Sequence, residues 1–247
     1  WSVSDTENFW AAVWDFCDIK AVTPYRRVAS DLDKFPGTQW FSGSELNFAE
    51  NMMRYNDDQV ALIGLLENGK RSSYTYSELY TEVERLASSM LDRGIVKGDR
   101  IAGLMPNIPE TVIALLATSS IGAIWSSCSP DFGIEGACDR FGQIEPRLLF
   151  TTESYLYDGK IINSLEKIGA IQEKITSIES VVVVSLFSDS VDLTHIKKSQ
   201  HYTDFLNQDV KPLRFAPLPF DHPLYIMYSS GTTGIPKCIV HLSLIHI

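Results

Sequence analysis

The chain has 247 residues, is 45% hydrophobic and carries a formal net charge of −10, with its acidic residues spread along its length. This composition is ordinary for a globular protein, and the negative charge argues against a nucleic acid or an anionic membrane as a partner. The longest apolar stretch, 111–127, is interrupted by Ser119, Ser120 and Gly122 and is shorter than the roughly 20 apolar residues of a membrane-spanning helix, so we expect no membrane insertion.

Residues 1–55 indicate an N-terminal cap with helical or irregular structure. They contain little strand pattern and four of the five tryptophans, Trp1, Trp10, Trp14 and Trp40. The segment 7–16 has the spacing of a short helix. Tryptophan and phenylalanine at helical spacing belong to a core more often than to a ligand site, so we expect the cap to pack on the body of the protein.

After the cap, apolar strand-like runs alternate with amphipathic helical segments. The predicted strands are 60–66, 100–104, 123–127, 148–152, 181–187 and 224–228. Several of these runs are continuously apolar, as in strands that are covered on both faces. The alternation predicts an α/β fold in which helices flank a layered, largely parallel sheet.

The helices of this body have clear start and stop signals. Thr75 and Glu78 form a T-x-x-E capping box, and Gly94 provides the stop for the helix that follows. A second helix is predicted to begin near Pro109, a residue that suits the first turn, and to end at Gly122. A third is predicted over 135–144.

The segment 228–238 carries the clearest chemical signal. It reads YSSGTTGIPKC and follows the apolar run LYIMY. Glycines let consecutive backbone N–H groups point at one anion, hydroxyl groups add uncharged donors, and the lysine adds a positive charge. A polyphosphate needs this combination, so we predict a phosphate-binding loop at the end of a strand.

Two other interpretations of this loop compete with the phosphate-binding one. Gly231 and Lys237 have the spacing of a Walker loop, G-x-x-x-x-G-K-[ST]. However, Pro236 lacks the N–H of the second glycine, and Cys238 is a poor ligand for a hard metal ion, so the pattern argues against a Walker-type NTPase. A Ser/Thr/Gly-rich turn without a ligand is the remaining alternative.

A family resemblance covers the chain up to His241. The loop YSSGTTGIPKCIVH resembles the signature of the adenylate-forming enzymes, which include acyl-CoA synthetases, luciferases and peptide-synthetase adenylation domains. The segment WFSGSELNFAENMM resembles the N-terminal signature of the acetyl-, propionyl- and acetoacetyl-CoA synthetases. Similarity to the acetoacetyl-CoA synthetases in particular is carried by IWSSCSPDFG, DRFGQIEPRLLF and DHPLYIMYSSGTTGIPKCIVH.

This resemblance implies an ATP-dependent acid:CoA ligase with ATP, Mg²⁺ and CoA as co-substrates. The carboxylate of acetoacetate would attack the α-phosphorus of ATP to give an acyl-adenylate and pyrophosphate, and the thiol of CoA would then displace AMP. Donors and Mg²⁺ would stabilise the charge on the leaving pyrophosphate. An acetyl- or propionyl-CoA synthetase and a non-catalytic nucleotide-binding module are the alternatives.

Site residues follow from the same resemblance. The β- and γ-phosphates would be held by Ser229, Ser230, Gly231, Thr232, Thr233 and Gly234, with Lys237 as a supporting charge. Lys160 falls where related acetyl-CoA synthetases place a basic residue near the CoA nucleotide. For both lysines, an ordinary solvated side chain is the competing interpretation. No catalytic residue and no metal ligand is assigned within the chain.

The resemblance also predicts an incomplete large N-terminal domain. The family's adenine-binding strands, acidic magnesium ligand, acyl pocket and small C-terminal domain follow the phosphate loop. We therefore expect residues 56–241 to form the first part of the AMP-binding domain, and the 247 residues alone to be inactive. The last six residues, 242–247, depart from the family and are expected not to be native sequence.

Cysteine usage predicts a cytosolic protein with reduced thiols. None of the four cysteines forms a CxxC pair, which argues against a zinc site or a thioredoxin-like motif. Four cysteines are also too few for a disulfide scaffold in a chain of this length.

Overall fold

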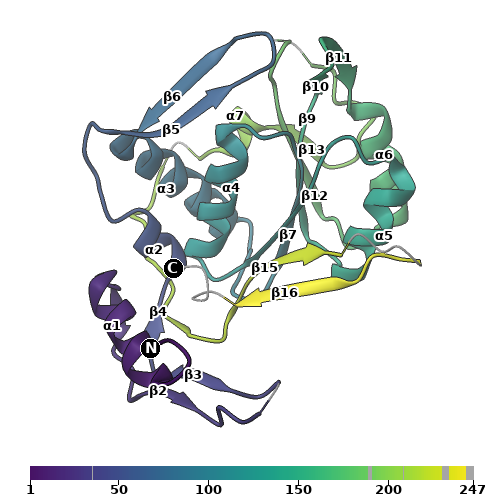
Figure 1. The fold of residues 1–247 in the computed structure, drawn as a ribbon. Coiled ribbons are helices and arrows are strands. Elements are labelled where there is room, and N and C mark those ends of the chain that lie inside the picture. The colour runs from purple at the N-terminus through teal and green to yellow at the C-terminus, as the bar shows by residue number, and fades with distance from the viewer. Residues whose placement is uncertain (35, 189–190, 208, 230–233, 243–247) are drawn as a thin grey trace.

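The structure, a computed structural model, describes residues 1–34, 36–188, 191–207, 209–229 and 234–242. Its main sheet contains β7 (Arg100–Leu104), β8 (Ile124–Cys128), β9 (Leu148–Thr152), β12 (Ser180–Val184), β13 (Ser199–His201), β15 (Pro223–Tyr228) and β16 (Cys238–Leu242). The strand order is β13-β12-β9-β7-β8-β15-β16. Every neighbouring pair is parallel except β15 and β16. The predicted α/β fold with a largely parallel sheet is therefore confirmed (Figure 1).

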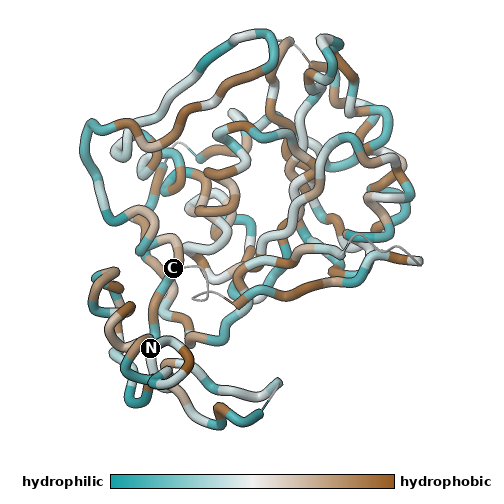
Figure 2. The backbone as a smooth tube through the Cα atoms, viewed as in Figure 1, coloured by the Kyte–Doolittle hydropathy of each residue, from teal (hydrophilic) through white to brown (hydrophobic). Residues whose placement is uncertain are grey.

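Helices cover both faces of this sheet. On one face lie α3 (Tyr76–Asp92) and α4 (Pro109–Ser120), and on the other lie α5 (Ile134–Ile144) and α6 (Leu165–Lys174). In β12, Val182 and Val184 enter the core under α3 and α4, whereas Val181 and Val183 enter the core under α5 and α6. A strand covered on both faces needs apolar side chains at consecutive positions, which accounts for the VVVV run. Figure 2 shows hydrophobic and hydrophilic residues alternating around the flanking helices.

Helix α3 begins and ends as the sequence predicts. The Glu78 N–H donates to the Thr75 hydroxyl over 3.2 Å, and Glu78 Oε2 accepts from the Thr75 N–H over 2.8 Å. Gly94 takes φ +76°, and the N–H of Ile95 returns to the Met90 carbonyl over 3.0 Å. The capping box and the glycine stop are both confirmed, because they satisfy backbone groups that the helix itself leaves unpaired.

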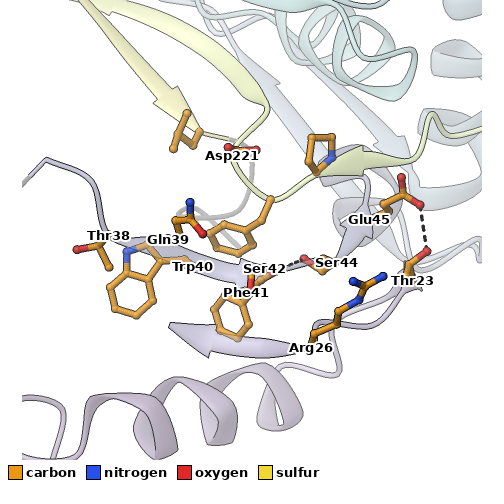
Figure 3. Close-up of a pocket in the computed structure, with 14 residues that line it drawn as sticks. Thr23, Arg26, Thr38, Gln39, Trp40, Phe41, Ser42, Ser44, Glu45 and Asp221 are labelled. Carbon is orange, nitrogen blue, oxygen red and sulfur yellow. Dashed lines mark hydrogen bonds between the residues drawn. The ribbon is translucent and has the colours of Figure 1, made fainter. Parts of the chain in front are cut away.

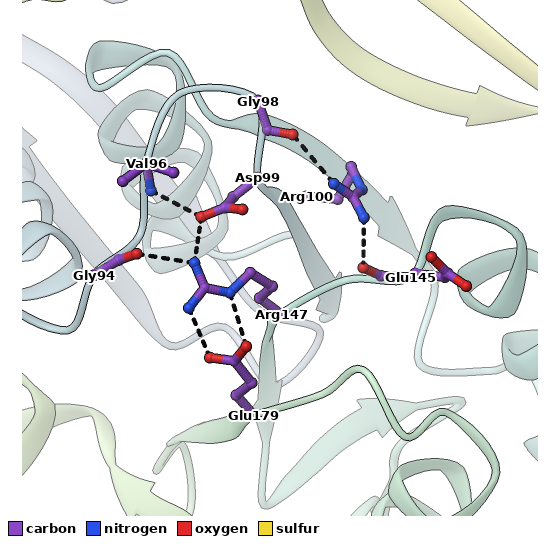
Figure 4. A network of polar contacts seen from close by, with 8 residues as sticks. All are labelled: Gly94, Val96, Gly98, Asp99, Arg100, Glu145, Arg147 and Glu179. Atoms are coloured by element: carbon purple, nitrogen blue, oxygen red, sulfur yellow. Dashed lines mark hydrogen bonds and ion pairs between the residues drawn. The ribbon is translucent and has the colours of Figure 1, made fainter.

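Arg147 joins the amino ends of three strands (Figure 4). Its Nη1 lies 2.6 Å from Asp99 Oδ2, before β7, and its Nε and Nη2 lie 2.9 and 2.8 Å from the two oxygens of Glu179, before β12. Arg147 itself directly precedes β9. The planar guanidinium matches this arrangement, since it can bind one carboxylate in a bidentate manner and still reach a second.

At the carboxyl ends of the strands, Glu153 joins β9 to the chain that follows β12. Its side chain is buried, with 6% exposure, and accepts hydrogen bonds from three consecutive backbone N–H groups, those of Leu186, Phe187 and Ser188, over 2.7, 2.5 and 3.1 Å. Burial of a carboxylate is costly unless hydrogen bonds compensate for the lost water. These three donors provide that compensation and fix the course of the loop.

The N-terminal region contains more strand structure than its sequence pattern indicates. Its elements are α1 (Thr6–Phe16), β1 (Ala21–Thr23), β2 (Arg27–Ser30), β3 (Gln39–Ser42), β4 (Glu45–Leu46) and α2 (Phe48–Met52). Strand β4 pairs with both β1 and β14 (Leu218–Pro219), and β2 pairs with β3. The pairing with β14 ties the region to a segment more than 150 residues further along the chain.

An aromatic cluster joins this region to the body. The Phe41 ring lies 4.7 Å from Trp14 and 5.0 Å from Phe220, measured between centroids. Trp14 therefore packs as predicted. Trp1, however, is 67% exposed and Trp10 is 39% exposed, although each ring contacts the ring of Phe9. The expectation that aromatic residues of this region pack as core therefore does not hold for Trp1 or Trp10.

The remaining elements lie outside the main sheet. β5 (Val60–Leu65) pairs with β6 (Arg71–Thr75), β10 (Ser154–Tyr157) pairs with β11 (Lys160–Asn163), and α7 (Tyr202–Phe205) is a short helix. The predicted strand at 60–66 thus exists, but it forms an antiparallel hairpin and does not join the parallel sheet. None of the helices in the described ranges is long and apolar enough to span a membrane.

Candidate functional site

The predicted phosphate-binding loop lies at the carboxyl end of β15, beside the carboxyl end of β8. Ligands of open α/β sheets bind outside the carboxyl ends of the parallel strands. Of the predicted residues, the structure describes Ser229, Gly234 and Lys237. The others lie outside the described residues: Ser230, Gly231, Thr232 and Thr233. Both ends of the loop are therefore at the edge of the sheet where a ligand is expected.

Hydrogen bonds close the base of this loop. The Ser229 N–H donates to the Lys237 carbonyl over 3.0 Å, and the Lys237 N–H donates to the Ser229 hydroxyl over 3.1 Å. From α5, the Gln143 side-chain amide donates to the Pro236 carbonyl over 2.8 Å. The two ends of the loop are thus fixed to each other and to the helix that packs beneath them.

Gly234 and Lys237 have the properties that an anion-binding loop requires. Gly234 takes φ +156°, a value that residues with a Cβ rarely adopt, although a Cβ there would meet no atom within 4 Å. The glycine is therefore needed for the backbone conformation and not for space. Lys237 is exposed and forms no ion pair with any described residue. Its positive charge is available to a ligand.

A cavity of about 470 Å³ adjoins the loop. It is lined by residues from α4, β8, α5 and β15 and by the turn after β8: Leu115, Trp125, Ser127, Cys128, Ser129, Phe132, Arg140, Tyr225, Ile226, Met227, Tyr228 and Ser229. Within it, Tyr228 Oη lies 2.9 Å from the Ser126 hydroxyl, and burial raises the pKa of Tyr228. Tyr228 is therefore a neutral hydrogen-bonding group at neutral pH.

Arg140 brings a positive charge into this cavity. Its guanidinium carbon lies 4.0 Å from the centroid of the Phe132 ring and 5.9 Å from that of Tyr228, and its Nη1 donates to the Gly136 carbonyl over 2.8 Å. Arg140 lies in the segment DRFGQIEPRLLF, but the resemblance assigns it no role. Its position depends on packing between α5, the turn after β8 and the end of β15, which no local pattern records.

A side chain of α6 holds the turn after β8 through a hydrogen bond. Lys167 Nζ donates to the Pro130 carbonyl, and the Ser129 hydroxyl lies 2.8 Å from Asp131 Oδ2. Burial lowers the pKa of Lys167, and the nearby Asp131 opposes that shift. The segment that resembles the acetoacetyl-CoA synthetases, SPDFG, thus forms an ordered wall of the cavity. No sequence pattern marks Lys167 as a residue of the site either.

Lys160 is separate from this arrangement. It is the exposed first residue of β11, and the hairpin tip beside it is held by a hydrogen bond from the Gly159 N–H to Glu67 Oε2 over 3.2 Å. Figure 1 places this hairpin well away from β15 and β16. The structure therefore does not bring Lys160 together with the described residues of the predicted phosphate site, and its role at the CoA nucleotide stays a prediction.

A second cavity, of about 530 Å³, lies between the N-terminal strands and residues 219–221 (Figure 3). Its aromatic lining comes from Trp40, Phe41 and Phe220. Two of its polar side chains are already engaged with the protein: the Thr23 hydroxyl lies 3.0 Å from Glu45 Oε2, and the Ser44 hydroxyl donates to the Phe41 carbonyl over 2.7 Å. This cavity is at the Leu242 end of β16, whereas the phosphate-binding loop is at its Cys238 end.

No metal centre accompanies the loop in the described ranges. No group of three or more His, Cys, Asp and Glu side chains there could hold a metal ion. The four cysteines are also free thiols in the structure. Burial raises the pKa of Cys128 to about 12, so this thiol lacks the thiolate character of a metal ligand.

Family models match nearly the whole chain. The model described as AMP-binding enzyme matches residues 48–243, and the model described as acetyl-coenzyme A synthetase N-terminus matches residues 1–52. Together these matches confirm the resemblance to adenylate-forming acyl-CoA synthetases that the sequence motifs indicate.

Individual relatives agree with these models. Acetoacetyl-CoA synthetase of Xenopus tropicalis is 44% identical over 98% of this chain and 37% of its own length. Malonamoyl-CoA synthetase vrtB of Penicillium aethiopicum is 41% identical over 98% of this chain and 35% of its own length. The solved structure of acetoacetyl-CoA synthetase from Streptomyces lividans has a TM-score of 0.92 and 37% identity, over 98% of this chain and 37% of that one. The chain thus spans little more than a third of the length of the relatives that it matches.

Proposed function

The chain belongs to the AMP-binding enzyme family, and on this premise we propose that the intact protein is an ATP-dependent acid:CoA ligase acting on acetoacetate. The observation that carries the proposal is the closed loop after β15, whose ends are joined by the paired hydrogen bonds of Ser229 and Lys237. The acid's carboxylate would attack the α-phosphorus of ATP and release pyrophosphate. The thiol of CoA would then attack the acyl carbon and release AMP.

The loop's role in this reaction is to stabilise the phosphate chain. Charge accumulates on the leaving pyrophosphate as the α-phosphorus is attacked, and preorganised donors stabilise that charge without having to reorganise. We assign the β- and γ-phosphates to the loop residues predicted from the sequence, Ser229, Ser230, Gly231, Thr232, Thr233 and Gly234. Lys237 would add a positive charge at the end of the loop.

Mg²⁺ belongs to this proposal only as the ion that accompanies ATP. The described residues offer no cluster of three or more metal-ligating side chains. Oxygen ligands from the substrate phosphates are the usual partners of Mg²⁺ in phosphoryl sites, and the ion would reduce the charge on the pyrophosphate. We therefore name no residue of this chain as its ligand.

The choice of acid is a narrower proposal. Acetoacetate and malonamate, the acids of the two kinds of relative above, share a carboxylate and a carbonyl group on the third carbon. They differ in a terminal methyl group against an amide NH₂. A pocket can distinguish this pair by offering, or not offering, acceptors for the two N–H donors of the amide. Such a hydrogen-bonding difference changes kcat/KM more than one extra methylene group in an apolar pocket does. We propose acetoacetate, because the segments SPDFG and DHPLYIMY resemble the enzymes of that name.

The domain assignment of this chain follows the same proposal. We propose that residues 1–55 form the N-terminal cap region of short-chain acyl-CoA synthetases. Residues 56–241 would form the first part of the AMP-binding domain. The proposed CoA contact at Lys160 would lie on the hairpin of β10 and β11.

An acid panel on the intact protein tests the function. Acetoacetate, malonamate, acetate and propionate are each supplied with ATP, Mg²⁺ and CoA, and pyrophosphate release and thioester formation are both measured. We expect acetoacetate to exceed acetate in kcat/KM by at least roughly tenfold, or about 1.4 kcal/mol of discrimination. A preference for malonamate, acetate or propionate would reassign the acid. Failure to form any thioester would contradict the ligase proposal.

A further inference from the structure

We propose that Arg140 binds a phosphate oxygen of the nucleotide in the cavity beside the loop. This inference rests on the proposed function, because it assumes that a nucleotide is the occupant of the site. It gives a role to a residue to which neither the loop motif nor the family resemblance assigns one. The carrying observation is a guanidinium that faces the cavity without an anionic partner among the described residues.

Stacking fixes the position of the guanidinium. Its carbon lies 4.0 Å from the centre of the Phe132 ring and 5.9 Å from that of Tyr228. Both aromatic residues line the same cavity as Ser229, the first residue of the loop. A planar cation stacked on an aromatic ring keeps its edge free to donate hydrogen bonds. The stacked arrangement therefore orients the group and does not consume its donors.

Partners for Arg140 within the described residues do not account for its charge. Nη1 donates to the Gly136 carbonyl over 2.8 Å, a neutral acceptor on the preceding turn of α5. The acidic side chain one turn earlier, Glu135, pairs with Lys174 instead. No carboxylate among the described residues lies within ion-pair distance of Arg140. Most of its N–H donors are therefore available.

Arg147 and Arg140 differ in the partners of their guanidinium groups, and Arg147 has those of an arginine with a structural role. Arg147 binds two carboxylates and a carbonyl and joins the ends of three strands. Arg140 is likewise partly shielded from water, yet it faces a cavity. A partly desolvated charge without a counter-charge is unfavourable until an anion arrives. The fork of an arginine matches the oxygens of a phosphate, and this match gives geometric specificity as well as attraction.

Two matched substitutions separate binding from stability. Arg140→Gln and Arg147→Gln are made in the intact protein. The affinity for inorganic pyrophosphate and for ATP, both with Mg²⁺, is measured by calorimetry, and the melting temperature is measured without ligand. We expect Arg140→Gln to weaken pyrophosphate and ATP binding by at least about tenfold with little change in melting temperature. Arg147→Gln should lower the melting temperature and leave both affinities unchanged. Arg140→Lys should recover part of the lost affinity, because it restores the charge without the fork.

The outcomes are distinguishable. If the wild-type protein binds neither pyrophosphate nor ATP, the proposed function fails, and this inference fails with it. If the wild type binds both and Arg140→Gln binds them equally well, the role of Arg140 alone is wrong. The same conclusion follows if Arg140→Gln lowers the melting temperature as much as Arg147→Gln does.

Discussion

The Lys237 N–H donates to the Ser229 hydroxyl across the base of the loop, with 3.1 Å between the nitrogen and the oxygen. Residues eight positions apart are thereby joined at the point where β15 ends and β16 begins. The contact holds the two ends of the loop at a fixed separation. Ends that are fixed in this way are what a cradle for a phosphate chain needs.

Ser229→Ala tests this closure. The substitution removes one hydrogen bond, so stability should fall by only about 1 kcal/mol. The adenylation rate should fall by roughly tenfold, because the loop's donors are no longer held where the leaving pyrophosphate develops charge. Pyrophosphate release by the intact protein measures the rate, and denaturant unfolding measures the stability.

The matched control for this change is Ser199→Ala. The Ser199 hydroxyl likewise bonds to the backbone, as a donor to the Ile196 carbonyl over 2.7 Å, but it lies in β13 at the far edge of the sheet. Its removal should cost similar stability and leave the rate unchanged. Equal rates for the two alanine variants would show that the Ser229 contact has no special part in the reaction.

Gly103 lies against Trp125, and this contact gives a prediction about packing beside the cavity. A Cβ at Gly103 would lie 2.7 Å from two carbons of the Trp125 ring, much closer than a normal contact. Gly103→Ala should therefore destabilise the fold by about 1–3 kcal/mol, the usual range for overpacking. It should also change the near-UV circular dichroism of the tryptophans, because the ring must move.

Gly142→Ala is the control, because we expect it to change the stability in the opposite direction. Gly142 is exposed in the interior of α5, and a Cβ there would meet no atom within 4 Å. Alanine should stabilise this helix by about 0.5–1 kcal/mol, because it loses less backbone entropy than glycine. Denaturant unfolding of both variants checks the pair. A neutral or stabilising Gly103→Ala would contradict the described packing of Trp125.

The pairing of Glu179 with Arg147 predicts a pH effect on stability. Hydrogen bonds from Arg147 hold the pKa of Glu179 below its ordinary value of 4.5. A carboxyl group with a depressed pKa in the folded state contributes stability above its unfolded pKa, and this contribution is lost as the pH falls through the folded value. The loss should therefore begin near pH 4.5 and continue below it.

Glu179→Gln checks this assignment. The variant should be less stable than the wild type at pH 7, and the difference should shrink as the pH falls below about 4.5. The effect should be small, because Glu179 is more than half exposed and solvent screens the pair. Unfolding curves from pH 7 to pH 3 measure it. A difference that stays constant over this range would mean that the ionised pair does not stabilise the fold.

Much of the main sheet could be predicted from the sequence, because strands covered on both faces are continuously apolar. The strands at 100–104 and 148–152 have the predicted bounds. The strand predicted at 181–187 ends earlier, at Val184, where the chain turns to meet the carboxylate of Glu153. Strands of two to four residues in the N-terminal region, such as β4, are too short to show a period.

The candidate site was predictable only where a local motif marks it. The glycines, hydroxyls and lysine of 229–237 form one continuous segment, so their chemistry can be interpreted without a fold. Arg140 and Lys167 contribute through contacts with Phe132 and Pro130, which come from other elements. Such contacts arise from helix packing, and neither residue stands in a pattern that distinguishes it from a solvated side chain.

We propose above that the loop between β15 and β16 acts on the phosphates that leave in the first half-reaction. Thr233, which lies outside the described residues, is the most informative position to change. Removing a donor that acts mainly in the transition state should lower kcat more than it raises the KM for ATP. Thr233→Ala should therefore reduce adenylation by on the order of 10², by analogy with the loss of one oxyanion donor.

The most direct measurement compares the two half-reactions of Thr233→Ala in the intact protein. Adenylation is followed by pyrophosphate release, and thioester formation is followed from supplied acyl-adenylate and CoA. Our account predicts a large loss in the first step and a nearly unchanged second step, since pyrophosphate has already left by then. Equal losses in both steps, or a fall in thermal stability alone, would contradict the phosphate-binding role of this loop.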